Sequence, residues 1–517
     1  MSDWNQGYVT DVPYTYGYYR EMAPQSIRFA LNAAGWEAPP DEGYTYCELA
    51  FGQGSGLALM AAANPDGRFW GNDFNPSHVA GARRLAADAG LTNLELTDAS
   101  FAQMVERDLP EFDYVALHGV WSWVGRENWA HIVEFLRRKL KVGGAVYISY
   151  NTMPGWSAAH PLREVLHRVV ELGTSRAQHM PARIDEAMKT VERLKEVPGS
   201  YFARTPQIKD RVDAIVKGHK SYIAHEYLNR CWDPIYFAEM VDALAPAKLS
   251  FAAHASAVNC IHSMFHSKPL QELLDATPDP VLRETLRDMG LNTPFRRDLF
   301  VRGPRRLGGI AQADALFDRD YVLMHPRARC SLTIPTPQGE VKLAPEIYDP
   351  VLDALAGGRT AARSLMKHPG FADLQGSKRL LRALIVLCGV GYAAPCVSPA
   401  AAARAQPVVE RFNAALLQRA RRGSEEDFQW IASALIGSGL PQSRVDQFVA
   451  TLPRGGSGTV RMQDLVDDMA RRGIVLSKEG QMLKDPATVR DELATRLSTW
   501  EQEQRPLLGS HGLFQPR

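Results

Sequence analysis

A glycine-rich turn near the start of the chain is the strongest chemical signal in the sequence. Residues 47–56 read Cys-Glu-Leu-Ala-Phe-Gly-Gln-Gly-Ser-Gly, so a short strand-like stretch leads into Gly52, Gly54 and Gly56, and a helical pattern follows. Because glycine lacks a Cβ, such a turn lets the backbone approach a ligand closely and adopt positive φ. In open α/β sheets, ligands bind at the carboxyl ends of the strands, where this turn would lie. A plain tight turn fits the same residues.

Acidic residues follow the next two predicted strands. Asp73 ends the strand at 68–73, and Asp98 follows the strand at 93–96. A carboxylate at the first position can accept hydrogen bonds from both ribose hydroxyls, and one at the second can accept from an adenine amino group. Either aspartate alone also fits a helix N-cap. Together, at successive strand ends, they predict an adenosine site that includes the adjacent Phe74 and Ala99.

The glycine spacing indicates which adenosine cofactor would bind. Dinucleotide enzymes usually show G-x-G-x-x-G, whereas the third glycine here comes one position early. S-adenosylmethionine carries no phosphate and so needs no helix N-terminus aimed at a pyrophosphate. Glu48 suits the ammonium of its methionine tail and the surroundings of its sulfonium, while a phosphate site would not favour a carboxylate there. We therefore predict S-adenosylmethionine as the cofactor, with a nicotinamide cofactor as a distant alternative.

Polar residues after the fourth and fifth predicted strands are the candidates for catalysis. His118 ends the strand at 112–118, and Tyr150 and Asn151 end the strand at 144–150. An oxygen acceptor would need a general base, commonly histidine, whereas a lysine must first lose its proton, which a dry apolar pocket favours. We take these three residues as candidate catalytic groups and place His118 near the cofactor as well. A hydrogen-bonded core histidine is the alternative for His118.

Aromatic residues surround these candidates in the sequence. Trp121, Trp123 and Trp156 lie in the same two loops and could wall a narrow channel for a methyl acceptor, so they are candidate substrate-binding residues. Hydrophobic packing is the alternative for the tryptophans, and residues 151–155 could form a simple turn because Asn, Pro and Gly interrupt regular structure.

The strands and helices that would position these residues alternate over the first 156 residues. The predicted strands lie near 45–50, 68–73, 93–96, 112–118 and 144–150, with helical patterns near 56–63, 77–89, 101–107 and 126–140. Parallel strands need long crossovers, so this alternation predicts a doubly wound α/β domain of the Rossmann type.

The rest of the chain has a different pattern. Residues 161–245 read as helices, a strand is possible at 248–255, and the Arg- and Gly-rich stretch 296–310 reads as a boundary. Residues 330–344 suggest a hairpin among helical segments. We predict three domains: an α/β domain at 1–160, a helical domain at 161–305, and a mostly helical C-terminal domain at 306–517.

Composition narrows the classes of function. The 517 residues carry a net charge of +1 and 45% hydrophobic residues, so the chain is globular and no overall positive field attracts nucleic acid. The longest apolar stretch, 383–397, is shorter than the ~18 residues of a membrane helix. Six scattered cysteines without a CxxC motif, and no signal-peptide pattern, favour a cytoplasmic protein. We expect no membrane insertion and no nucleic-acid partner; the oligomeric state stays open.

Two other patterns carry little weight. Cys260, His262 and His266 have some of the spacing of a metal site but lack a clear fourth ligand, so no metal site is predicted. The arginines within 296–306 could contact phosphates, but such a run is more often a solvated or acid-paired surface.

Several segments, in order, resemble the class I S-adenosylmethionine-dependent methyltransferases. They are E-L-x-F-G-x-G-x-G at 48–56, G-N-D-F-N-P at 71–76, T-D-A-S-F at 97–101, the stretch 112–124, and the stretch 143–156. The last two, with segments 224–229, 232–237 and 295–303, resemble bacterial methyltransferases that carry a methyltransferase regulatory domain. That group includes rickettsial protein-lysine methyltransferases of outer-membrane proteins. The resemblance covers about residues 5–305, and it implies that the domain at 161–305 is the regulatory domain and the one at 1–160 the methyltransferase domain.

The resemblance implies a methyltransferase that modifies a protein, with lysine as the acceptor. It also matches Val12-Pro13-Tyr14 to a family tract, so Tyr14 is expected to contact the cofactor as part of a lid. Ala50 stands where the family commonly has glycine, and Phe51 where it has Cys or Ser. Methylation of a small molecule or surface sugar on oxygen or nitrogen, and an inactive cofactor-binding regulator, are the alternatives that remain open.

Overall fold

The computed structural model describes most of the chain. The described residues are 8, 14, 16–175, 177–216, 220–336, 339–421, 428–450, 466, 467, 469, 471, 476–478, 481–483 and 485–513.

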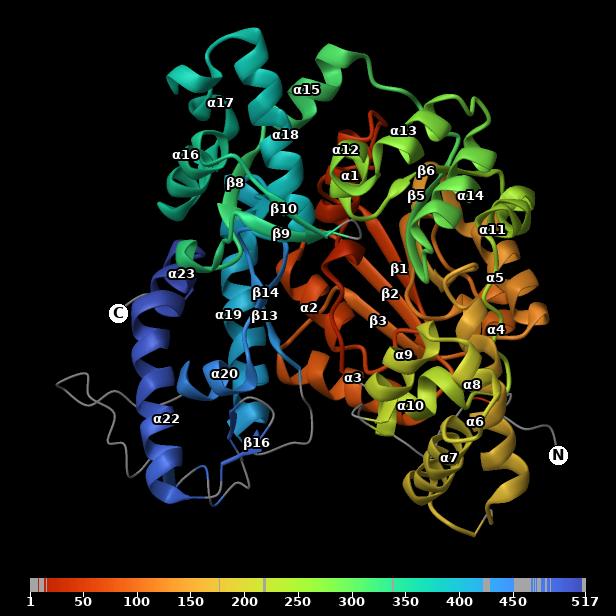
Figure 1. Cartoon of the computed structure of the whole chain (residues 1–517). Helices are drawn as coiled ribbons and strands as arrows, with labels where there is room; N and C mark the ends of the chain where they lie inside the picture. Colours follow the sequence, from red (N-terminus) through yellow and green to blue (C-terminus); the bar gives the residue numbers. More distant parts are fainter. Residues whose placement is uncertain are drawn as a thin grey trace.

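A seven-stranded sheet forms the centre of the molecule (Figure 1). Its strand order is β3-β2-β1-β4-β5-β7-β6, and β1 to β5 are parallel to one another, while β7 runs antiparallel between β5 and β6. The strands are β1 Thr45–Leu49, β2 Arg68–Asp73, β3 Leu94–Asp98, β4 Phe112–Leu117, β5 Leu140–Asn151, β6 Leu249–His254 and β7 Phe295–Arg302. The predicted doubly wound α/β fold is confirmed. The order reverses between β1 and β4, which is where open α/β sheets bind ligands.

Both faces of the sheet are covered, which explains the apolar strands of the sequence. Side chains alternate between two hydrophobic cores: Tyr46 and Tyr147 belong to one, Cys47 and Ile148 to the other. The helices between the parallel strands are α2 Ser55–Ala63, α3 Pro76–Asp88, α4 Phe101–Glu106 and α5 Arg126–Lys139.

The predicted division at residue 160 cuts through this sheet, so it is wrong in that respect. The segment 161–305 is not helical throughout, because it contributes β6 and β7, and β7 pairs with β5 in a register that sets Arg296 opposite Tyr150. Strand β7 could not be predicted from the sequence because its buried face carries charged side chains. Arg296 is buried there beside Asp298, and the two side chains form an ion pair at 2.7 Å.

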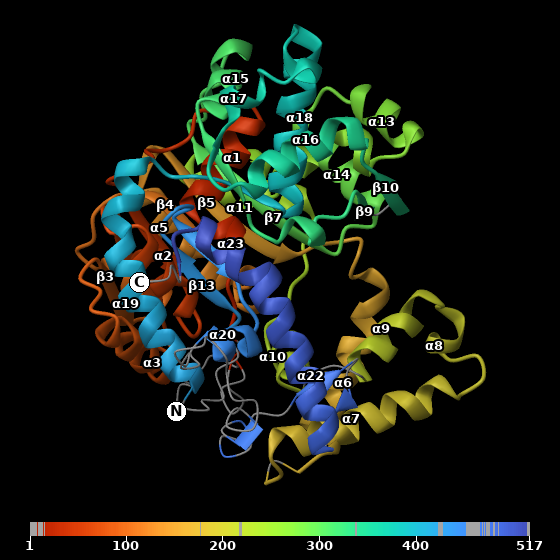
Figure 2. The ribbon, with the colours of Figure 1, turned by 90° about the vertical axis from the view of Figure 1, so that its left-hand side faces the viewer.

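A helical insertion lies between β5 and β6 and has its own hydrophobic core. It comprises α6 His160–Gly173, α7 Met180–Lys195, α8 Tyr201–Arg204, α9 Gln207–Val216 and α10 Lys220–Tyr227. In Figure 2 it projects away from the sheet. The remaining helices of 161–305 flank the last two strands; they are α11 Phe237–Leu244, α12 His262–Phe265, α13 Lys268–Asp275 and α14 Pro280–Leu291.

The C-terminal region is mostly helical, as predicted, and packs on the catalytic domain. Its helices are α15 Gly309–Phe317, α16 Pro345–Ala356, α17 Ala362–Leu365, α18 Leu374–Val390, α19 Pro399–Arg421, α20 Arg444–Ala450, α22 Pro486–Thr499 and α23 Arg505–Ser510. Its strands are β8 Asp320–Leu323, β9 Thr333–Thr336, β10 Gly339–Lys342, β11 Thr360–Ala361, β12 Ala393–Pro395, β13 Trp430–Ser433, β14 Ser438–Pro441, β15 Ser477–Lys478 and β16 Gln481–Met482. The expected hairpin is β9–β10.

One continuous core joins this region to the catalytic domain. It runs from α1 Pro24–Ala33 and α2 to α18 and α19, and α19 lies along α2 and α3 in both views of the molecule (Figures 1 and 2). Within the described residues, no helix is long and apolar enough to span a bilayer.

Candidate functional site

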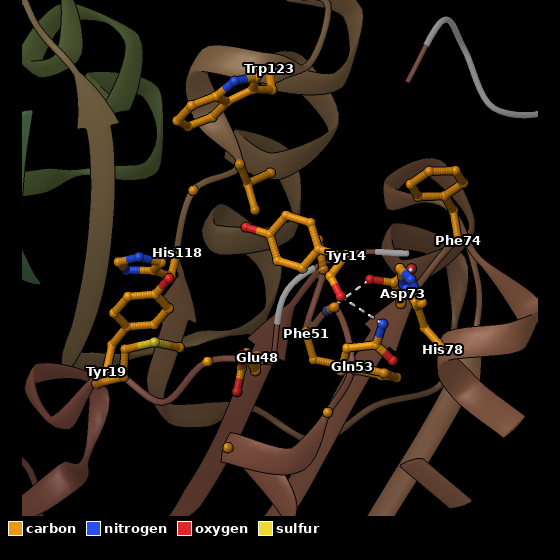
Figure 3. Close-up of a pocket in the computed structure, with 18 of the residues that line it drawn as sticks. Tyr14, Tyr19, Glu48, Phe51, Gln53, Asp73, Phe74, His78, His118 and Trp123 are labelled. Carbon is orange, nitrogen blue, oxygen red and sulfur yellow. Dashed lines mark hydrogen bonds and ion pairs between the residues drawn. The ribbon is translucent and has the colours of Figure 1, made fainter. Parts of the chain in front are cut away.

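Two adjoining cavities open at the carboxyl ends of the parallel strands. The first spans about 950 Å³, its open mouth included, between the glycine-rich turn, the end of β2 and the N-terminal arm with Tyr14 and Tyr19 (Figure 3). The second spans about 1100 Å³, its open mouth included, between that arm, the end of β5 and helices α9 and α10. Both are lined by the same six residues, which therefore form their common wall: Tyr8, Tyr14, Tyr19, His118, Gly119 and Trp123.

The glycine-rich turn takes the conformation that its sequence predicts. Gly52 and Gly54 have φ values of 61° and 70°, and a Cβ at Gly54 would lie 2.6 Å from the Cβ of Ala82 on α3. Ala50, at the family's glycine position, has a φ of 56°, a conformation that costs a non-glycine residue about 1–2 kcal/mol. Phe51 is buried against Gly54 and borders the first cavity, so it supports the turn.

Asp73 ties the turn to the end of β2. One carboxylate oxygen accepts a hydrogen bond from the backbone N–H of Gly52 at 2.9 Å, and the other accepts from the N–H of Asn75 at 2.9 Å. The second oxygen also lies 3.2 Å from Nδ1 of His78. Because a carboxylate offers about four acceptor positions, Asp73 retains capacity for a ligand hydroxyl at the cavity it lines.

Glu48 is a buried acidic residue at the edge of the first cavity. Its side chain borders the first cavity and is 8% exposed, and its Oε2 has no hydrogen-bond partner. Burial, and secondarily the charge of Asp73, raise the pKa of Glu48 to about 8. A buried, unpaired carboxylate is unfavourable unless a ligand neutralises it, so this position suits the ammonium or sulfonium of S-adenosylmethionine.

Ala99 and Asp98, the cofactor residues predicted at the end of β3, differ in their surroundings. Ala99 lines a recess that adjoins the first cavity and shares Phe74 and Phe101 with it. Asp98 does not line that recess. It ends β3, which forms an edge of the sheet, and its side chain is exposed to solvent. That Asp98 accepts a hydrogen bond from the adenine stays a prediction.

The structure brings four of the predicted acceptor-side residues to the second cavity. Its lining includes His118, Trp123, Asn151 and Trp156. The N-terminal arm also reaches it through Tyr14, as the lid prediction requires, while Val12 and Pro13 lie outside the described residues.

Tyr150 and Trp121 do not reach either cavity, so their predicted roles are wrong. Tyr150 alternates with Asn151 along β5 and therefore faces the opposite side of the sheet, where its hydroxyl donates to Asp298 at 2.7 Å. Trp121 is fully buried and stacks on Trp129 with ring centroids 4.9 Å apart.

His118 sits in the common wall as a neutral ring. It stacks on Tyr19 with centroids 3.3 Å apart, an arrangement visible in Figure 3. Its Nδ1 lies 2.8 Å from the hydroxyl of Tyr147 and 3.2 Å from that of Ser149. Burial, with a contribution from Arg297, lowers the pKa of His118 to about 3, so the ring is a weak base near neutral pH.

Comparison with known proteins agrees with this geometry. A model of the methyltransferase domain matches residues 47–144, and one of a predicted methyltransferase regulatory domain matches residues 219–302. The uncharacterized protein sll1526 of Synechocystis is 35% identical over 515 residues, 99% of each chain. The uncharacterized protein RP028 of Rickettsia prowazekii is 27% identical over 233 residues, covering 45% of this chain and 91% of that protein.

A solved structure shares the fold over nearly the whole chain. PKMT2 from Rickettsia typhi, in complex with AdoHcy, aligns with a TM-score of 0.65 at 20% identity, covering 94% of this chain and 98% of that one. This chain belongs to the class I S-adenosylmethionine-dependent methyltransferases that carry a methyltransferase regulatory domain. The cofactor of the methyltransferase is S-adenosylmethionine, and Glu48, Asp73 and the glycine-rich turn fit it.

The segment that matches the regulatory domain supplies part of the wall of the second cavity. Residues 219–302 include α10, which supplies Tyr222, His225 and Glu226, and β7, which supplies Arg297. In the sequence, segment 224–229 stands out through its family resemblance alone. Nothing in its spacing showed that these side chains face the ends of β4 and β5.

One residue that lines the recess was not predicted from the sequence. Asn72 lines it, and its Nδ2 donates to the carbonyl of Ala99 at 2.8 Å, while its Oδ1 is buried without a partner. Its signal was the position directly before Asp73 at the end of β2.

Among the described residues, no group of three or more His, Cys, Asp or Glu side chains could hold a metal ion.

Proposed function

We propose that this methyltransferase transfers the methyl group to a lysine side chain of a protein. S-adenosylmethionine supplies an electrophilic methyl group, and the chain must orient the acceptor opposite it and keep water away. The observation that carries the proposal is the second cavity, which shares an aromatic wall with the cofactor cavity.

The walls of the second cavity suit the end of a lysine side chain. Tyr14, Tyr19, Trp123 and Trp156 line it. Aromatic rings attract cations through their electron-rich faces and pack against the methylene stem of lysine. Apolar surroundings of this kind also favour the neutral amine once the proton has left.

The state of His118 argues against an oxygen acceptor. An alcohol needs a general base with a pKa near the working pH, and the pKa of His118 is lowered to about 3. The histidine that would have favoured a sugar or small-molecule hydroxyl is therefore poorly suited to that role. The shared fold with PKMT2 agrees with a protein acceptor.

For the cofactor, we propose roles for the residues around the first cavity and its recess. Glu48 pairs with the ammonium of the methionine tail, Asp73 accepts from the ribose, and the backbone at Gly52, Gly54 and Gly56 allows close approach. Tyr14 covers the ligand. The unpartnered Oδ1 of Asn72 would accept from the adenine amino group, in a recess lined by Phe74 and Ala99, beside the predicted contact of Asp98.

We also propose that the enzyme acts in the cytoplasm on a protein partner. All six cysteines are free thiols, as is usual in a reducing compartment.

The test is methylation of candidate proteins, bacterial outer-membrane proteins included, with isotopically labelled S-adenosylmethionine. Digestion and mass spectrometry would identify the modified residue, and we expect N-methyllysine. Label found on an oxygen atom, or on small molecules of an extract and on no protein, would refute the proposal. Full binding of the cofactor without turnover on any acceptor would point to a regulator instead.

A further inference from the structure

Glu226 is an acidic residue that faces the second cavity from the helical insertion. It lies near the end of α10 and is only partly exposed, and its Oε1 accepts a hydrogen bond from Nδ2 of Asn151 at 3.1 Å. Asn151 ends β5, so the hydrogen bond connects the insertion to the sheet. No ion pair to Glu226 is formed within the described part of the chain.

The cations of the same cavity are engaged with other groups. Arg211 of α9 donates from Nε to the hydroxyl of Tyr227 at 3.1 Å, and its guanidinium lies 3.5 Å from the ring centroid of Trp156. Arg297 of β7 donates to Glu21 at 3.2 Å. The charge of Arg211 acts on Glu226 and lowers its pKa, although no ion pair joins the two side chains within the described residues. The carboxylate accepts its hydrogen bond from the neutral amide of Asn151, and it lines the cavity where an incoming cation can approach it.

The titratable side chains around Glu226 are mostly neutral near pH 7. Burial raises the pKa values of Tyr8, Tyr14, Tyr19 and Tyr222 above the usual range for tyrosine, and burial lowers that of His118. The ring of His225, also on α10, packs edge-on against Tyr14 with centroids 5.1 Å apart.

Glu226 is close enough to the common wall to affect it. Its negative charge contributes to the raised pKa values of Tyr8, Tyr14 and Tyr19, three residues of that wall. Burial raises the pKa of Glu226 itself to about 7, which is the range of an effective proton acceptor at neutral pH.

We propose that Glu226 is a catalytic residue that binds the ammonium of the acceptor lysine and removes one of its protons. In this step an N–H bond breaks and an O–H bond forms on the carboxylate. The ammonium and the carboxylate both become neutral, and the nitrogen lone pair is left free to accept the methyl group. Asn151 is a positioning residue, because its amide holds the carboxylate toward the cavity. This inference rests on the proposed amine acceptor.

The test uses the full chain saturated with AdoHcy and n-butylammonium as a mimic of the lysine side chain. Calorimetry between pH 6 and 8 compares the wild type with Glu226→Gln, which removes the charge and keeps the shape. Glu164→Gln is the matched control, since Glu164 lies on the same insertion with a side chain that is 45% exposed and paired with Arg168. AdoHcy affinity and melting temperature check that each variant is folded.

We expect the wild type and the control to bind n-butylammonium more tightly as the pH rises through about 7, because the carboxylate form of Glu226 then predominates. Glu226→Gln should bind it about tenfold more weakly and lose this pH dependence, as expected when an ion-paired hydrogen bond is removed. Glu226→Asp should keep the pH dependence with lower affinity, and it serves if Glu226→Gln does not fold.

Two results have separate meanings. If Glu226→Gln binds n-butylammonium as the wild type does, with the same pH dependence, Glu226 is not the proton acceptor. If the wild type binds n-butanol in preference to n-butylammonium at every pH, the amine acceptor itself is wrong, and the proposed function fails before the role of Glu226 is reached.

Discussion

The C-terminal hairpin contacts the arm that covers the cofactor cavity, and a single methyl group should disturb this contact. The backbone N–H of Gly439 in β14 donates to the hydroxyl of Tyr18 at 2.9 Å, and the ring of Tyr18 packs against Trp430 in β13. Tyr18 borders the cofactor cavity, and the next residue, Tyr19, stacks on His118. We predict that Gly439→Ala weakens cofactor binding from a position in the C-terminal region.

The size of the effect follows from the contact. A Cβ at Gly439 would lie 2.7 Å from Cε1 of Tyr18, closer than side-chain atoms approach one another, so the arm must shift. Overpacking by a methyl group costs about 1–3 kcal/mol. If the arm of the variant moves aside in the free protein to avoid the overpacking, closing it over the ligand costs that same free energy, and binding is weaker by this amount. The affinity for AdoHcy should then fall by about fivefold to 150-fold, since 1.4 kcal/mol is tenfold.

Calorimetry with AdoHcy on the full chain measures this loss. Gly509→Ala is the control in the same region, because a Cβ at Gly509 would meet nothing within 4 Å. We expect the control to bind as the wild type does. An unchanged AdoHcy affinity in Gly439→Ala, at a melting temperature that falls, would show that the hairpin stabilises the fold without positioning the arm, and would refute this reasoning.

Three further predictions concern the first cavity. Asp73→Ala removes the proposed ribose acceptor and the anchor of Gly52, so calorimetry should show AdoHcy binding weaker by about 1.5–3 kcal/mol, and unchanged affinity would exclude Asp73 from the site. Because the pKa of Glu48 is raised to about 8, its carboxylate form grows as the pH rises from 6 to 7.5, and binding of S-adenosylmethionine should tighten over that range. Glu48→Gln should abolish this trend; an identical trend in the variant would contradict the pairing. Gly54→Ala combines a φ of 70° with a Cβ 2.6 Å from that of Ala82, so thermal unfolding should show a loss of about 2–5 kcal/mol, and wild-type stability would mean the turn can relax.

Much of the fold could be predicted because most of its strands are short, contiguous apolar segments of the sequence. The strand predicted at 68–73 coincides with β2, and the one at 248–255 contains β6. The place of β6 and β7 in the sheet could not be predicted. It depends on an antiparallel pairing between residues about 150 positions apart, and on the burial of Arg296 against acidic partners, which a hydrophobicity pattern reads as surface.

The error at Tyr150 has a clear physical origin. A strand that is buried on both faces alternates its side chains between two cores, and composition does not reveal which core adjoins the ligand. Tyr150 and Asn151 therefore look equally suitable as catalytic residues in the sequence, although their side chains face opposite sides of β5.

The sequence by itself determined the strand ends and the turn that line the cofactor cavity of this methyltransferase. Glu48, the glycine turn and Asp73 lie within 26 residues and belong to one strand–turn–helix–strand unit, whose geometry follows from local backbone preferences. Only the tertiary structure decided the acceptor side. Its cavity gathers the N-terminal arm, the end of β5, helix α10 and strand β7, and such long-range contacts depend on packing that no local spacing encodes.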